Sequence, residues 1–236
     1  MPFTPLDRIV SLGNDGVFTS TVDAASARNN LRDNNASSIA VQVSNPYPFW
    51  PRLDNFLNDN NPNPNFSGAA QPQFIWNKPQ AFPDETVFFA VGSSLFGIAG
   101  QATADFSVYL TSFADNAHQV EEIRLFQVDG TTPPFSYTPV HDLVNASPPA
   151  FTTAPLADGP LMQPKEVDPP FLWQNVRYYS NSFSYMNPNN SSRTYQIIVV
   201  FRAKNYLNPP NLIRNPGGLA FHVDIYSQNA SLAATP

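Results

Sequence analysis

His222 and Asp224, two residues apart, come closer to a catalytic site than any other pattern in this chain. On a β-strand such a pair lies on one face. A histidine with a carboxylate can supply two of the three protein ligands of a mononuclear iron site. The third would be a histidine further along, but only twelve residues follow Asp224 and none is a histidine; His118 and His141 lie far upstream. We therefore expect the pair to occupy the exposed polar face of a strand.

An oxygen-rich run with Asp54, Asn58 and Asp59 is the candidate metal site. Calcium binds six to eight oxygen ligands of this kind. The run lacks the central glycine and the closing glutamate of an EF-hand loop, so a solvated loop with Asx turns is the favoured interpretation and calcium the alternative. The chain has no cysteine, which excludes disulfides and thiolate ligands. We expect no cofactor.

Other groups that could support hydrolysis do not form a recognisable set. Glu121 and Glu122 are adjacent, and neighbours on a regular strand point to opposite faces, so they do not face each other across a cleft as paired catalytic carboxylates do. No Gly-x-Ser-x-Gly sequence occurs. The sequence predicts a protein that is not an enzyme.

Two long stretches rich in proline and asparagine interrupt the chain. Residues 45–84 hold eight prolines and residues 129–172 hold ten, out of 25 in all. Loops of this length are usually functional or disordered, and their large aromatic side chains argue against disorder. We consider three roles for these rings: anchors that fill pockets on a neighbouring subunit, platforms for sugar rings, or caps over the chain's own core. The candidate interface or ligand-stacking residues are Tyr47, Phe49, Trp50, Phe74, Trp76, Phe171 and Trp173.

Composition restricts the partners. Charged residues make up only 13% of the 236 residues, and the net charge is −6 with 12 Lys plus Arg. The absence of a basic run argues against nucleic acid, and the absence of ~18 successive apolar residues argues against a membrane span. No signal-peptide pattern opens the chain. With 19 Phe and 9 Tyr to place, a chain with so few charges is expected to bury surface against other chains. A virion or extracellular assembly is favoured over a free cytoplasmic monomer.

The remaining sequence alternates as β-strands do. In 105–113 and 219–227 every second residue is apolar, and in 38–44 the alternation places Ile39, Val41 and Val43 on the inner face. Residues 194–203 are apolar on both faces, which predicts a central strand covered from both sides or by a partner. Strands are also expected at 86–91 and at 120–128, the latter with a bulge near Leu125 and Phe126. Weaker strands are expected at 16–22 and 177–185, and an edge strand at 8–12. One short helix is expected over 23–31, with Asp23 as its N-cap.

About nine strands separated by turns predict an all-β fold: one domain, 1–236, forming an antiparallel β-sandwich of jelly-roll or Greek-key type with the two loop insertions. The predicted function is that of a non-enzymatic structural subunit of capsid, virion-decoration or filament type. It would assemble with copies of itself or with other subunits through its aromatic loops. The alternative is a carbohydrate-binding module with an exposed tryptophan in a shallow groove.

If the tryptophans are interface anchors, Trp50→Ala or Trp173→Ala should weaken assembly by roughly 2 kcal/mol or more per contact, as truncation of a hot spot does. Sedimentation equilibrium measures this change. Unaltered assembly in both variants would favour the capping role.

Overall fold

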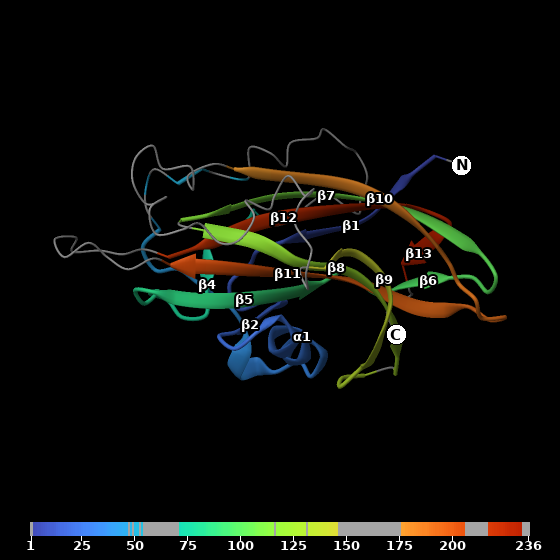
Figure 1. Ribbon diagram of the computed structural model, residues 1–236, viewed down its shortest axis with the longest axis horizontal. Helices are drawn as coiled ribbons and strands as arrows, with labels where there is room; N and C mark the ends of the chain where they lie inside the picture. Colours follow the sequence, from blue (N-terminus) through green and yellow to red (C-terminus); the bar gives the residue numbers. More distant parts are fainter. Residues whose placement is uncertain are drawn as a thin grey trace.

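The computed structural model describes residues 2–46, 48, 50–51, 53, 71–115, 117–130, 132–145, 176–205 and 217–232. In this part of the chain, two layers of β-strands face each other and one α-helix lies against the outer side of one layer (Figure 1). The elements are β1 (Thr4–Val10), β2 (Val17–Ser20), α1 (Ala24–Arg32), a 3-10 helix (Ala36–Ser38), β3 (Val41–Gln42), β4 (Ile75–Trp76), β5 (Glu85–Gly92), β6 (Phe96–Ile98), β7 (Thr103–Ala114), β8 (Ala117–Asp129), β9 (Ser136–Asn145), β10 (Arg177–Met186), β11 (Arg193–Asn205), β12 (Leu219–Gln228) and β13 (Ala230–Leu232).

Both sheets are antiparallel, so the chain is an all-β sandwich as the sequence predicts. The first sheet has the order β10-β7-β12. The other side of β12 pairs with β1 along one part of its length and with β4 at its start, and β3 pairs with β4. The second sheet has the order β9-β8-β11. The other side of β11 pairs with β5 along one part of its length and with β6 along another. Strand β2 then pairs with β5, and β13 pairs with β6. Long strands far apart in sequence thus form the centre of each layer.

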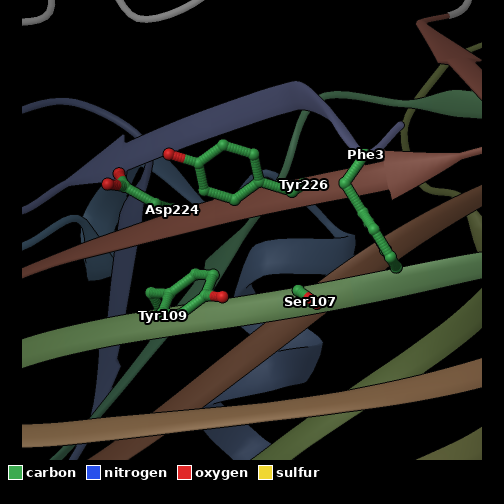
Figure 2. Close-up of a pocket in the computed structure, with 5 residues that line it drawn as sticks. All are labelled: Phe3, Ser107, Tyr109, Asp224 and Tyr226. Carbon is green, nitrogen blue, oxygen red and sulfur yellow. The ribbon is translucent and has the colours of Figure 1, made fainter. Parts of the chain in front are cut away.

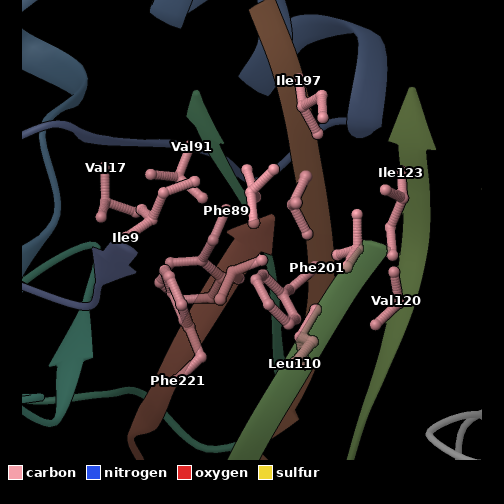
Figure 3. Close-up of a cluster of buried hydrophobic side chains, with 14 of the residues drawn as sticks. Ile9, Val17, Phe89, Val91, Leu110, Val120, Ile123, Ile197, Phe201 and Phe221 are labelled. Carbon is pink, nitrogen blue, oxygen red and sulfur yellow. The ribbon is translucent and has the colours of Figure 1, made fainter. Parts of the chain in front are cut away.

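The core between the sheets follows the predicted alternation. Phe106, Val108 and Leu110 of β7 point inward with at most 1% exposure. On β12, Phe221 stacks on Phe201 of β11, with ring centroids 4.5 Å apart (Figure 3). Fully burying one such side chain contributes roughly 1.5–3 kcal/mol, so these rows supply much of the stability.

Strand β11 is buried on both faces, as its sequence predicts. Ile197 and Val199 face the core between the sheets, whereas Ile198 and Val200 form a second cluster with Ala27 of α1. The cover on the second face therefore comes from the chain's own helix. The helix begins where expected, because the Asp23 carboxylate accepts a hydrogen bond from the Ser26 amide at 2.7 Å.

A bulge in β8 corrects the expectation that Glu121 and Glu122 point to opposite faces. The ladder between β8 and β11 shifts at this point, so that Val120 pairs with Phe201 and Glu122 with Val200, leaving Glu121 as the extra residue. Glu121 forms an ion pair with Arg202, and Glu122 forms one with Arg28 of α1. Both carboxylates therefore lie on the helix side of the sheet. At the predicted bulge position, Leu125 and Phe126, the irregularity lies in the pairing with β9.

Residues 38–44 do not form the predicted continuous strand. The side chain of Asn35 caps a 3-10 helix over Ala36–Ser38, and only Val41–Gln42 is extended in a sheet. Of the predicted inner set Ile39, Val41 and Val43, only Val43 is buried, and Ala40, predicted to point outward, is buried instead of the other two.

The predicted boundaries of the second insertion are also corrected, because residues 136–145 within it form β9. The segment was predicted to be part of a proline-rich loop, and it contains Pro139. The proline is tolerated because β9 is an edge strand and Pro139 lies beside an irregularity in its pairing with β8. The short strands β4, β6 and β13 were likewise not predicted, since two or three residues give no periodicity.

The contact between α1 and β11 can be tested with two alanines of one helix. Ala27 is fully buried, whereas Ala25 is exposed. Ala27→Leu should lower the free energy of unfolding by about 1–3 kcal/mol through overpacking, and Ala25→Leu should change it by less than about 0.5 kcal/mol. Denaturant unfolding measures both. Equal effects would contradict the packing of this helix face.

Candidate functional site

Trp50 packs on the outer face of the first sheet, at one end of β7 and β12. Its ring centroid lies 4.5 Å from that of Phe74 and 6.3 Å from that of Phe113, and only 5% of the residue is exposed. The indole reaches the backbone before β12 because position 218 is glycine: a Cβ atom there would lie 2.8 Å from Cζ3 of Trp50. The aromatic cluster is thus closed by contacts within the chain.

The indole Nε1–H of Trp50 donates a hydrogen bond of 2.7 Å to the carboxylate of Asp115, in the turn after β7. Asp115 is itself buried, and burial raises its pKa to about 7 even though the hydrogen bond from Trp50 favours the charged form. A titratable carboxyl group therefore contacts the N–H edge of the buried Trp50 ring.

Trp76 lies deeper still, at 1% exposure, where β4 joins the first sheet. Its Nε1–H donates to Glu85 at 2.9 Å, and Lys78 forms an ion pair with the same carboxylate. The ring packs on Phe89 with centroids 5.5 Å apart. Its polar edge is therefore satisfied and its apolar surface is buried.

Trp50 and Trp76 are buried against the chain's own core, as the capping role requires. Phe74 is partly buried and packs against Trp50 and Phe113. Part of any effect of Trp50→Ala will therefore come from lost packing in its own chain. The other residues of the predicted set lie outside the described residues: Tyr47, Phe49, Phe171 and Trp173, together with the calcium candidates Asp54, Asn58 and Asp59.

Exposed aromatic rings gather elsewhere, over the middle of the first sheet. A shallow hollow of about 410 Å³ is lined by Phe3, Ser107, Tyr109, Asp224 and Tyr226 (Figure 2). Tyr109 and Tyr226 meet edge to face at 5.6 Å. Tyr109 is 49% exposed and Phe3 45% exposed, so their rings remain accessible. This open sheet face, defined by these five residues and by the neighbouring Tyr178 and Ser182 of β10, is the candidate functional site.

The charge on this face is neutralised within the chain. Arg8 on β1 binds Asp224 on β12 with two hydrogen bonds of 2.6 Å, and the Arg8 side chain is only 4% exposed. His222 and Asp224 were expected to be exposed, but they are 4% and 8% exposed respectively. They do lie on one face, as predicted, and the guanidinium next to Asp224 explains why that carboxylate can be buried.

A serine and a histidine form one further pair with chemical potential. Ser112 Oγ lies 2.8 Å from His118 Nε2, a distance suited to activating a nucleophile. However, Ser112 is fully buried and His118 is 6% exposed, because both point between the sheets. The pair satisfies polar groups inside the sandwich. Among the described residues, no group of three His, Asp or Glu side chains could hold a metal ion.

The sequence matches no protein-family model and no curated protein. In the described ranges, no helix has the length and apolar character needed to cross a bilayer. The open sheet face was not predicted from the sequence, although Tyr109 and Tyr226 each lie at an outward-pointing position of an alternating strand. That alternation was the signal that could have identified them.

The Asp115 carboxyl predicts a specific pH dependence. Its folded pKa of about 7 exceeds its ordinary value of 3.8, so the folded state holds an additional proton between these values. The contribution of Asp115 to stability should therefore be fully present below about pH 3.8 and be lost as pH rises to 7, at up to about 1.4 kcal/mol per pH unit. Asp115→Asn keeps an oxygen acceptor for Trp50 and should remove this contribution, making the variant more stable than wild type at pH 8.

Denaturant unfolding across this pH range, followed by tryptophan fluorescence, measures the effect. Asp33→Asn is the control, because Asp33 is exposed and its hydrogen bond to Arg32 lowers its pKa below this window. The assignment fails if wild type and Asp115→Asn share the same dependence on pH.

Proposed function

We propose that this protein is a non-enzymatic structural subunit that assembles with copies of itself or with other subunits, as capsid, virion-decoration and filament proteins do. The observation that carries the proposal is the open sheet face. It presents Phe3, Tyr109 and Tyr178 at 45–51% exposure, around an ion pair that is already neutralised. Such a surface loses little hydration energy when it is covered, which favours burial against another protein.

The distribution of charge over the two sheets supports the same conclusion. On the second sheet, the helix side carries ion pairs of Arg28 and Arg124 with Glu122, and of Arg202 with Glu121. Tyrosine and serine predominate on the open sheet face of the first sheet. With charged residues at 13% of the chain, this uneven distribution leaves one side suited to solvent and the other to a partner.

We further propose that the sandwich is of the jelly-roll type. The order β1-β12-β7-β10 in one sheet and β5-β11-β8-β9 in the other supports this assignment. Consecutive long strands β7 and β8, and likewise β11 and β12, belong to opposite sheets, as expected for two nested Greek keys. Jelly rolls occur in viral capsids and in lectins, so the fold is compatible with both a structural subunit and a carbohydrate-binding module and does not distinguish between them.

A carbohydrate-binding module is the second candidate, favoured by the hollow in Figure 2. Aromatic rings of Tyr109 and Tyr226 could stack on a sugar ring, while Asp224 and the Ser107 hydroxyl offer polar contacts. In this case the open sheet face would bind glycan, and the protein would remain monomeric.

Light scattering after size-exclusion chromatography separates these functions. A structural subunit should gain mass with concentration, and Tyr109→Ser should raise the concentration required by roughly tenfold, the effect of losing about 1.4 kcal/mol at an interface. Phe82→Ser is the control, because Phe82 is 63% exposed and lies outside the open sheet face. A strict monomer at high concentration that binds a glycan array through Tyr109 would support the second function instead.

A further inference from the structure

The open edges of the two sheets differ in how they are protected. Strand β1 carries Pro5 and a register shift, and β9 carries Pro139 and two shifts. Strand β2 has only four residues. Prolines, irregular pairing and short length are all features that prevent one sheet edge from pairing with another.

Strand β10 has none of these protections. It is ten residues long, its pairing with β7 is regular throughout, and from Tyr178 to Met186 it contains no proline and no charged residue. Among the described residues, β7 is the only strand that pairs with it. In Figure 1 it forms the outer edge of its layer. Within the described ranges this edge is therefore unguarded, and an edge of this length is a template for another strand.

The backbone groups of β10 that point away from β7 belong to the even-numbered residues. The amide of Ser182 donates to the side chain of Asn181 at 2.8 Å, so this N–H points away from β7. Because hydrogen bonding alternates along an antiparallel strand, Ser180 and Ser184 present their groups in the same direction. All three serines are exposed. Small side chains on these residues leave room for an approaching backbone.

The sequence of β10 is nearly symmetric about Ser182. In an antiparallel pair centred on that residue, Ser180 lies opposite Ser184 and Tyr179 opposite Tyr185 of the second strand. Tyr178 lies opposite Met186, an aromatic and an apolar side chain that are 51% and 54% exposed in the single chain. No like charges meet in this register, and the even-numbered residues form the hydrogen-bonded pairs.

We propose that β10 pairs antiparallel with β10 of a second copy of this chain, about a two-fold axis at Ser182. The inference rests on the proposed function, since it specifies one contact of the self-assembling subunit. The two first sheets would become one continuous sheet, and the two open sheet faces would lie side by side. A two-fold axis makes the same surface serve both copies, which the near-symmetric sequence permits.

The register can be tested by placing charge on the axis. Ser182→Lys brings two lysines together across the axis, and Ser182→Glu brings two glutamates together. Each variant alone should raise the dissociation constant of the dimer by roughly tenfold or more. An equimolar mixture of the two should restore association, because lysine then faces glutamate. Ser192→Lys in the exposed turn after β10 makes the same charge change away from the edge and should have no effect.

Analytical ultracentrifugation of each variant and of the mixture gives the dissociation constants, and thermal unfolding verifies that each variant folds. If Ser182→Lys does not fold, Ser184→Lys and Ser180→Glu replace it: neither variant brings like charges together in its own dimer, but their mixture places lysine opposite glutamate and should associate more tightly than either variant alone. Recovery of association in the mixture supports self-pairing of β10.

Three results would overturn the inference, and they separate it from the proposed function. If wild type assembles and the Ser182 variants assemble equally well, β10 is not the contact, while self-assembly stands. If both variants are weakened but the mixture is not restored, the edge pairs with a different strand. If wild type is monomeric at every concentration, both proposals fail.

Discussion

The need to cover strand β11 on both faces is the constraint on which the arrangement of this protein depends. Its alternate residues Ile197 and Ile198 are both fully buried, one toward the core between the sheets and the other toward α1. A single sheet-on-sheet contact would leave the second row exposed to water at a cost of roughly 1.5–3 kcal/mol per large side chain. The helix removes that cost on the outer face of the second sheet, whereas among the described residues the outer face of the first sheet carries an aromatic cover at one end, around Trp50.

From this asymmetry follows the division of the molecular surface. In the part of the chain that the structure describes, the helix side carries the salt bridges, whereas the first sheet presents tyrosine and serine on its outer face and ends in the unguarded edge of β10. Arg8 and Asp224 show how this face remains low in net charge, because each neutralises the other. The open face and the open edge adjoin, since Ser107 Oγ on β7 lies 2.6 Å from Ser182 Oγ on β10. A partner at the edge would therefore also approach the aromatic hollow.

Periodicity predicted the regular parts of the fold and failed where local chemistry intervened. The alternation of β7 and the doubly apolar pattern of β11 required no other information, and Asp23 identified the start of α1. In contrast, the 3-10 helix capped by Asn35 takes the first residue of the strand predicted over 38–44, of which only Val41–Gln42 is extended in a sheet. Strand β9 was missed because it lies within a proline-rich stretch. The bulge at Glu121 reversed the side on which that residue lies, because an inserted residue shifts the alternation that sequence reasoning relies on.

The candidate site was harder to predict than the fold for a physical reason. Tryptophan attracts notice because it is large, yet Trp50 and Trp76 satisfy their Nε1–H groups with Asp115 and Glu85 inside the chain. A sequence does not reveal which aromatic residues have such partners. Tyr109 is half exposed and was less conspicuous, although its phase on β7 opposite to that of Leu110 indicated its direction.

The close approach of Gly218 to Trp50 should make two distant parts of the chain depend on each other in evolution. A side chain at position 218 would collide with the indole, so this glycine is constrained by the identity of residue 50. Drift at the two sites should then be correlated. Descendants that replace the tryptophan by a smaller residue would be free to lose the glycine, and lineages that keep the one should keep the other.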